Sequence, residues 1–302
     1  MSSPSVSFNI FNDNVNKDNK IVLKSWWVEY DPSAVKIFDY LLSDVIHKYN
    51  KVVVHSVFGR PPTPQQKEPN TLYIQYSGEP GYLDPSCFDI NIIPSIPYLR
   101  NIVVFPQAYY GIYVGIDKQS QCLDHLLFTE KRTLSAQQQR EKDKFCVFLV
   151  SNPKTEVRNH MFHLLSSYKK VDSYGKHLNN TKNVPFEPEM VKKYKFFISF
   201  ENNAMDFYFT EKLINAFMYG AIPIFWGFPQ IREYINMDAI IYLPPNFTQT
   251  DVQRVMNEIV ALDNDDALYK KKYEQCLFKD GKIPDAFQLE HIKRQINLLC
   301  GV

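Results

Sequence analysis

The sequence predicts an α/β protein of two halves, each built on a sheet of parallel strands. Short apolar segments alternate with longer amphipathic segments along the chain, which is typical of strand–helix–strand units. Residues 145–150 read FCVFLV without a polar break, as expected for a strand buried on both faces of a sheet. The chain has 302 residues, close to the size at which one hydrophobic core stops growing, so we expect two domains.

The first half opens with a strand and a helix. An apolar run covers residues 21–27, and residues 32–49 place apolar side chains at helical spacing. Further apolar runs follow, each bounded by Gly, Pro or polar residues. They predict strands over residues 52–58, 71–76, 88–93 and 102–105.

A polar segment, residues 130–144, separates the two halves. It reads EKRTLSAQQQREKDK with almost no apolar periodicity, which indicates a solvated helix at the seam. The second half then alternates strands and helices in the manner of a doubly wound nucleotide-binding domain. Its expected strands are residues 145–150, 195–200, 221–226 and 240–243, and its expected helices are residues 156–168, 210–219, 250–262, 266–277 and 284–299.

Composition narrows the classes of function. The chain has 34 Lys and Arg against 33 Asp and Glu, a formal net charge of +1, which argues against general attraction to nucleic acid or an anionic membrane. Neither GxGxxG nor GxxxxGK[ST] occurs, so any phosphate must be held by a few local side chains. The five cysteines include no CxxC pair, which favours reduced thiols. With no apolar leader and no membrane-length apolar run, we expect a soluble, cytoplasmic protein.

The densest cluster of polar residues lies between a predicted strand and a predicted helix, over residues 200–212. Ligands bind at the carboxyl ends of strands in open α/β sheets. Thr210 is suited to cap the helix, which places Lys212 in the first turn, where the helix dipole disfavours a cation. Lys212 therefore either meets an anionic ligand or extends into solvent. Arg158 holds the corresponding position after the preceding strand, where it either clamps a diphosphate or pairs at the surface with Glu156 or another carboxylate.

Residues 193–227 resemble the signature of the α1,3/α1,4-fucosyltransferase family. The shared features are a phenylalanine-glutamate-asparagine triplet, a tyrosine, a threonine-glutamate-lysine, and a proline followed by a glycine. In this chain they are Phe200-Glu201-Asn202, Tyr208, Thr210-Glu211-Lys212, Pro223 and Gly227. Residues 144–162 resemble soluble bacterial members, in which an arginine of this segment contacts the donor, and Arg158 matches it. Ser77-Gly78-Glu79 followed by Phe88-Asp89 resembles the acceptor segment whose glutamate is the catalytic base.

The resemblance implies a GT-B-like fold, in which two Rossmann-like domains face a cleft. Residues 1–143 would bind the acceptor and residues 144–302 would bind GDP-fucose, with the last helix free to pack back on the first domain. Family members move L-fucose from GDP-β-L-fucose to a hydroxyl of a GlcNAc or glucose unit with inversion. The implied product is an α1,3 or α1,4 fucoside on an oligosaccharide or glycoconjugate. We expect that no metal or other cofactor is required, although a divalent cation could stimulate the reaction.

Inversion by a single displacement needs a base on the acceptor side and charge stabilisation on the leaving-group side. The resemblance makes Glu79 the base, and the nearby Asp84 and Asp89 are the alternatives. The residues it assigns to the donor are Arg158, Asn202, Tyr208, Glu211 and Lys212. Of these, the two cations would neutralise the departing GDP. The asparagine and tyrosine would donate to the phosphates, and the glutamate would hold the ribose or stabilise charge on the fucose ring.

Two other functions stay open: a GT-B transferase for another nucleotide sugar, and a non-catalytic glycan-binding relative. Asp263-Asn264-Asp265-Asp266 contains a D-x-D, which holds a metal in other glycosyltransferases, but a helix N-cap and acidic first turn is favoured here. His160 and His163 share a helical face without a third ligand, so we interpret them as structural or solvated. The pairs Trp26-Trp27 and Tyr109-Tyr110 either stack on sugar rings or pack in the core.

Overall fold

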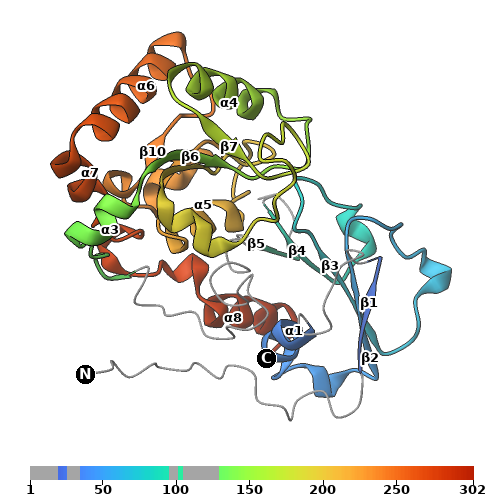
Figure 1. Ribbon diagram of the computed structural model, residues 1–302. Coiled ribbons are helices and arrows are strands. Elements are labelled where there is room, and N and C mark those ends of the chain that lie inside the picture. Colours follow the sequence, from blue (N-terminus) through green and yellow to red (C-terminus); the bar gives the residue numbers. More distant parts are fainter. Residues whose placement is uncertain (1–19, 26–34, 95–100, 105–128) are drawn as a thin grey trace. The chain divides into compact units, whose positions relative to one another are not determined.

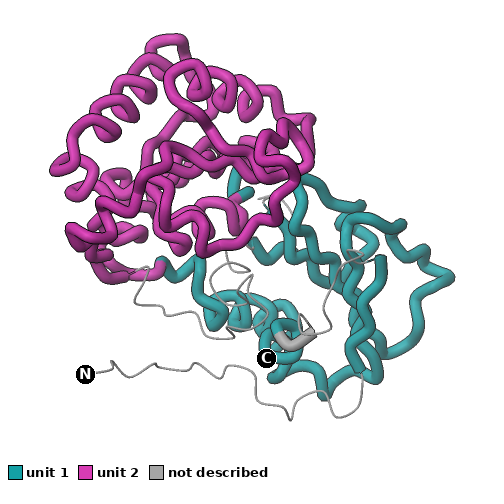
Figure 2. Tube along the Cα trace, viewed as in Figure 1, with its two compact units in different colours: residues 1–123, 206–208, 284–302 teal, residues 124–205, 209–283 magenta. Residues whose placement is uncertain are grey.

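The computed structural model describes residues 20–25, 35–94, 101–104 and 129–302 (Figure 1). The chain forms two compact units (Figure 2). Unit 1 comprises Met1–Leu123, Asp206–Tyr208 and Pro284–Val302, and unit 2 comprises Asp124–Met205 and Phe209–Ile283. The aromatic pairs Trp26-Trp27 and Tyr109-Tyr110 lie outside the described residues.

The sheet of unit 1 consists, within the described residues, of five parallel strands that follow one another in chain order. They are β1 (Ile21–Lys24), β2 (Lys51–His55), β3 (Thr71–Tyr76), β4 (Ile90–Ile93) and β5 (Ile102–Val104). Every residue of β4 is buried, and so are all but the first residue of β2 and β3. Burial on both faces explains why these strands read as apolar runs rather than as alternating patterns.

The first helix ends earlier than its apolar pattern predicts. Helix α1 (Val35–Leu42) ends where Ser43 turns back and donates its hydroxyl to the carbonyl of Tyr40, 3.0 Å away, a side-chain bond that competes with helix continuation. Asp44 then pairs with the last helix, α8 (Leu289–Leu299). Lys293 Nζ lies 2.9 Å from its carboxylate, and Asn297 donates to the same group at 2.8 Å.

The sheet of unit 2 is also parallel, but its strand order reverses. The order is β10-β9-β8-β6-β7, so β6 pairs with both β7 and β8. The strands are β6 (Lys144–Phe148), β7 (Val171–Ser173), β8 (Tyr194–Ile198), β9 (Ile222–Phe225) and β10 (Ile241–Tyr242). The chain leaves β6 in one direction along the sheet and leaves β8 in the other, which makes the β6–β8 boundary a topological switch point.

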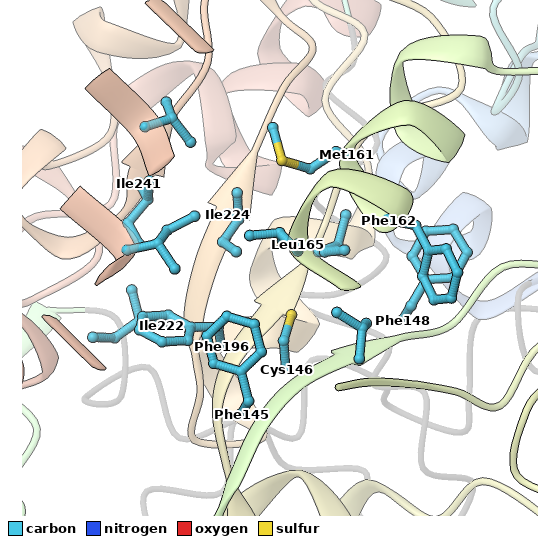
Figure 3. Close-up of a cluster of buried hydrophobic side chains, with 14 of the residues drawn as sticks. Phe145, Cys146, Phe148, Met161, Phe162, Leu165, Phe196, Ile222, Ile224 and Ile241 are labelled. Carbon is cyan, nitrogen blue, oxygen red and sulfur yellow. The ribbon is translucent and has the colours of Figure 1, made fainter. Parts of the chain in front are cut away.

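Helices cover both faces of this sheet. On one face, α4 (Glu156–Tyr168) and α6 (Gln249–Asn264) bury their apolar side chains against the strands. Figure 3 shows Met161, Phe162 and Leu165 of α4 meeting Cys146 and Phe148 of β6 in this cluster. On the other face, α5 (Glu211–Met218) packs through Ala216 in a second apolar cluster. Each large apolar side chain buried in this way contributes about 1.5–3 kcal/mol, so the two layers hold the strand ends firmly in place.

The solvated helix expected over residues 130–144 is present but short. Only α3 (Ala136–Glu141) is helical, and two cations beside it enter the core of unit 2. Arg132 lies between the rings of Phe217 and Tyr273, 3.7 and 4.0 Å from their centroids. Lys142 is buried, and its ammonium donates to backbone carbonyls, including that of Tyr194 at 2.9 Å. The charges are hidden because carbonyl groups of distant residues satisfy them, which the local polar pattern does not reveal.

Candidate functional site

The switch point of unit 2 gathers the sequence-predicted polar residues. The loop after β6 leads into α4, and the loop after β8 leads into α5. Both loops therefore start at neighbouring carboxyl strand ends, where open α/β sheets bind ligands. Arg158 and Asn202 come from these two segments, and the start of α5 adds Lys212.

Glu201 is the buried anchor of the second loop. Its carboxylate is fully buried and accepts from the backbone N–H of Thr210 at 2.8 Å and from the Thr210 hydroxyl at 2.7 Å. The ammonium of Lys212 donates to it at 3.2 Å. Burial raises the pKa of Glu201 above the usual carboxyl value, and the positive charge of Lys212 opposes that rise. The carboxylate thus joins the strand end to the first turn of α5.

Thr210 caps α5 as predicted, with its hydroxyl accepting from the backbone N–H of Lys212. The ammonium of Lys212 does not extend into solvent, because the side chain is only 26% exposed and pairs with Glu201. A second carboxylate, that of Glu211, lies 3.6 Å from it. The unfavourable placement of a cation at a helix N-terminus is therefore offset by two acids of the motif. The sequence analysis considered an anionic ligand or solvent as the surroundings of Lys212, and did not consider pairing with acids of the same motif.

A glycine makes room for the buried acid. Gly227, which follows β9, has a φ of +157°, and a Cβ built there would lie 2.6 Å from Cγ of Glu201. The backbone N–H of Glu201 donates to the carbonyl of Trp226 at 2.9 Å, which holds the two segments at this close approach. Any side chain at position 227 would force the carboxylate to move. Sequence reasoning did not select Glu201 as a site residue, although the triplet containing it and this glycine were both visible.

Arg158 and Asn202 meet directly. The guanidinium is 2% exposed, donates to the side-chain oxygen of Asn202 at 2.8 Å, and donates to the carbonyl of Asn152 at 2.6 Å. Thr155, at the start of α4, donates its hydroxyl to the carbonyl of Asn202 at 3.1 Å. The interpretation of Arg158 as a surface residue paired with Glu156 is therefore wrong. Both of these acceptors are neutral oxygens.

The remaining predicted residues take other positions. Tyr208 is buried within Asp206–Tyr208, a segment that belongs to unit 1. Glu211 lies in the first turn of α5, with its side chain 36% exposed. Glu79 lies on the loop that follows β3 in unit 1, as predicted, and is half-buried.

Hydrogen bonds from uncharged side chains fix the loop that carries Glu79. Gln75 donates to the carbonyl of Leu83 at 3.3 Å and accepts from its N–H. Gln75 also donates to the side-chain oxygen of Asn91 at 2.7 Å. The hydroxyl of Ser77 donates to the carbonyl of Glu79 at 2.9 Å. These neutral residues fix the loop without lending charge to Glu79, and sequence reasoning did not select Gln75 or Asn91 because buried amides leave no pattern of spacing.

The alternative bases have structural partners. Asp84 caps a short 3₁₀ helix by accepting from the backbone N–H and the hydroxyl of Ser86, at 3.0 and 2.7 Å. Asp89 accepts from the backbone N–H of Tyr73 at 2.7 Å and lies 3.5 Å from the ammonium of Lys67. Both carboxylates therefore hold the strands and turns around the Glu79 loop.

The D-x-D motif is a helix boundary, as favoured. Asp265 caps α7 (Asp266–Tyr273) by accepting from two backbone N–H groups at 2.9 Å. Asp263 is buried and pairs with Lys169 at 2.9 Å and Lys195 at 3.3 Å. His160 and His163 are exposed on α4. Across residues 20–25, 35–94, 101–104 and 129–302, no cluster of three His, Cys, Asp or Glu side chains suits a metal ion. In the same residues, no helix has the length and apolar character to cross a membrane.

Comparisons with known proteins agree with the motif. Residues 139–281 match the model of the C-terminal region of glycosyltransferase family 10 (fucosyltransferase). A protein of Acanthamoeba polyphaga mimivirus, named as a fucosyltransferase, is 28% identical over 77% of this chain and 37% of its own length. The α-(1,3)-fucosyltransferase of Helicobacter pylori is 35% identical over 33% of this chain and 21% of its own. Human GDP-fucose protein O-fucosyltransferase 3 is 30% identical over 36% of this chain and 25% of its own.

Solved structures show the same fold. A crystal structure of α1,3-fucosyltransferase with GDP-fucose superposes with a TM-score of 0.69 and 18% identity, covering 93% of this chain and 90% of the other. The predicted α/β architecture of the GT-B type, with two parallel sheets, is thereby confirmed. The matches span little more than a third, or less, of the length of these curated relatives. Residues 139–281 are thus similar to the C-terminal region of glycosyltransferase family 10, the fucosyltransferase family whose signature the motif resembles.

Proposed function

We propose that this chain transfers L-fucose from GDP-β-L-fucose to a hydroxyl of a GlcNAc or glucose unit, with inversion, to form an α1,3 or α1,4 fucoside. The observation that supports this most is the pair of cations at the switch point of unit 2. Arg158 is held by neutral oxygens and Lys212 by the motif acid Glu201. Both belong to segments that begin at the carboxyl ends of adjacent strands, where a nucleotide diphosphate binds in this class of fold.

On the donor side, the leaving group is GDP, and its departure places negative charge on the phosphate oxygen. A guanidinium and an ammonium stabilise that charge through short charge-assisted hydrogen bonds. Arg158 and Lys212 are the residues we assign to this role, with Asn202 and Tyr208 as further donors. Glu211, exposed beside Lys212, is available to the ribose hydroxyls or to positive charge on the fucose ring.

On the acceptor side, a hydroxyl must lose its proton as its oxygen bonds to C1 of fucose and the bond from C1 to the phosphate oxygen breaks. We assign that proton to the carboxylate of Glu79. The carboxylate lies on a loop fixed through the carbonyl of Glu79 and the backbone of Leu83. These hydrogen bonds restrict the backbone that carries the carboxylate.

The test is turnover of GDP-fucose by the purified chain. GDP release and fucosylated product are measured with lactose and N-acetyllactosamine as acceptors, and the linkage is read by NMR. We expect product with an α linkage on at least one acceptor. Release of GDP from another nucleotide sugar but not from GDP-fucose would replace the donor assignment. If no donor is turned over but the chain still binds glycans, the result would favour the alternative of a non-catalytic glycan-binding protein.

A second acceptor class is favoured by a specific similarity. The protein O-fucosyltransferases 3 of dog, cow and human are 30–31% identical to this chain over 36% of its length, and their name places the fucose on a protein hydroxyl. The same assay with folded polypeptide acceptors, followed by mass spectrometry, separates the two classes. Transfer to polypeptide but not to saccharide would move the proposal to a protein acceptor.

A further inference from the structure

We propose that unit 2 contains a second anion site, separate from the switch point, which binds the phosphate group of a small molecule. The site is a cavity of about 450 Å³ beside β7, the strand at one end of the described sheet. It is lined by Lys144, Lys170, Asp172, Tyr174, Asn180, Thr181, Lys182, Val184, Met190 and Lys193. None of the residues assigned to the donor is among them.

The charge of the lining is strongly positive. The lining includes four lysines but one acid, Asp172. Two of them already pair with it, Lys170 at 2.6 Å and Lys144 at 3.6 Å. Within the described part of the chain, no hydrogen bond or ion pair engages the ammonium groups of Lys182 and Lys193. Two cations without an acid in one concave surface repel each other, and a doubly charged oxyanion would relieve that repulsion.

Hydrogen bonds link three lining residues of the cavity to the buried Tyr194. The hydroxyl of Tyr194 donates to Asp172 at 2.6 Å, and the hydroxyl of Tyr174 lies 2.9 Å from that of Tyr194. Lys144 also donates to Tyr194, at 3.2 Å. Because these groups satisfy one another, they do not compete for the two remaining ammonium groups. An incoming anion would therefore meet Lys182 and Lys193 first.

The wall that carries Lys182 is rigidly attached to the sheet. The side chain of Asn180 donates to the carbonyl of Val171 and accepts from the N–H of Ser173, both at 2.8 Å. In this way an amide side chain continues the ladder of β7. Lys182 and the following Asn183 have φ near +55°, and the oxygen of Asn179 accepts from the N–H of Asn183 at 3.2 Å. The cation is thus presented by a turn whose shape is fixed before any ligand arrives.

The position of the cavity is not the one that the fold provides for a nucleotide. Lys144 begins β6, Lys170 precedes β7, and Lys193 precedes β8, so three of the four cations stand at the amino ends of strands. Ligands of open α/β sheets collect at the carboxyl ends instead. The cationic lining therefore has no explanation in donor binding.

The decisive probe is inorganic pyrophosphate, titrated by calorimetry at constant ionic strength into the intact chain. The variant K182A/K193A removes both unpaired ammonium groups and should fold normally, because both side chains are exposed. We expect it to weaken one class of pyrophosphate site by tenfold or more. The matched control K271A/K279A makes the same change of charge on exposed residues of unit 2 and should leave binding unchanged.

Pyrophosphate also suits the proposed donor site, so a third variant, R158A/K212A, separates the two. It should weaken a different class of site and leave the one that depends on Lys182 and Lys193. Arms with glucose 1-phosphate and with GMP then distinguish a sugar phosphate from a nucleotide as the source of the phosphate. Equal pyrophosphate binding by K182A/K193A and the wild-type chain would overturn the proposal. So would equal losses in K182A/K193A and K271A/K279A, since that result means general charge attraction only.

Discussion

The two parallel sheets place their polar residues at strand ends in different ways. In unit 2, the ends of β6 and β8 are followed by charged side chains that are buried, Arg158 and Glu201. In unit 1, β2, β3 and β4 carry His55, Gln75 and Asn91, buried and uncharged. Burial and the charge of Lys24 lower the pKa of His55, which favours the neutral imidazole.

The two sets of residues differ in the energetic cost of burying them. Buried charges are costly unless they are paired and hydrogen-bonded, and Arg158 and Glu201 both have such partners. Neutral amides carry a smaller cost when they are buried. Under the proposed function, unit 2 determines affinity for the donor and unit 1 determines the rate of the chemical step.

The largest expected effect is on the rate, in unit 1. Glu79→Gln should fold normally, bind GDP with nearly unchanged affinity, and lose about 10²–10⁴-fold in transfer rate, because an amide cannot accept the hydroxyl proton. Transfer is measured at saturating GDP-fucose, and GDP affinity by calorimetry. Near-normal kcat in this variant, together with an inactive Asp84→Asn or Asp89→Asn variant, would show that the base is misassigned. The assignment of donor residues in unit 2 would not be affected by that result.

The next effect is on affinity, in unit 2. Arg158→Ala and Lys212→Ala should each weaken GDP and GDP-fucose binding by about 1.5–3 kcal/mol, the usual contribution of a charge-assisted hydrogen bond. Arg158 should cost more, because its guanidinium is more deeply buried than the ammonium of Lys212, which is 26% exposed.

Thermal unfolding of each variant controls for lost structure, and Glu201→Gln controls for the partner of Lys212. Calorimetric titration that gives wild-type affinity for both cation variants would remove the phosphate assignment.

A smaller effect is expected on the pH dependence of stability, through one aspartate in each unit. Burial raises the pKa of Asp39 on α1 to about 6, whereas Lys169 and Lys195 help hold that of Asp263 below its usual value. The folded pKa of Asp39 lies above the unfolded value, so the stability it contributes is present below pH 4 and is lost as the pH rises to 6. Asp39→Asn should then raise the free energy of unfolding at pH 7 by about 1 kcal/mol, after allowance for solvent screening, and change little at pH 4.

Urea unfolding at both pH values measures this difference. For Asp263 the sign is reversed: its stability is present above pH 4 and is lost as the pH falls further. An equal gain for Asp39→Asn at pH 4 and pH 7 would mean that the side chain acts through packing instead of charge.

The smallest expected effect is that of a chelator. Transfer should persist in EDTA, with at most modest stimulation by divalent cations, because Asp263 is neutralised by lysines and Asp265 caps a helix. Activity is compared before and after EDTA, with Mn²⁺ and Mg²⁺ added back. Complete loss that only a divalent cation restores would return the aspartates to consideration as ligands.

Much of the architecture was readable from the sequence where the apolar pattern is regular. Helix α4 and strand β3 have the predicted bounds, Glu156–Tyr168 and Thr71–Tyr76. Strand β7 escaped prediction because it is three residues long and contains a buried aspartate. The buried cations Arg132 and Lys142 escaped because their acceptors are carbonyl groups far along the chain.

The site was predicted unevenly for a similar reason. A motif identifies residue types in order, which sufficed for Arg158, Asn202 and Lys212. A motif does not say which carboxylate is buried. The structure shows that it is Glu201, because a Cβ at Gly227 would collide with its side chain. The supports of the Glu79 loop, Gln75 and Asn91, depend on register between strands, which spacing in one segment cannot supply.

The amide of Asn180 has a consequence for solubility. A strand at the border of a sheet exposes N–H and C=O groups to which a strand of another molecule can add, and such addition leads to aggregation. Asn180 and Thr181 occupy these groups on Val171 and Ser173 with their own side chains. A second molecule would have to displace this loop before it could extend the sheet at β7, so the chain carries its own protection against assembly at that border.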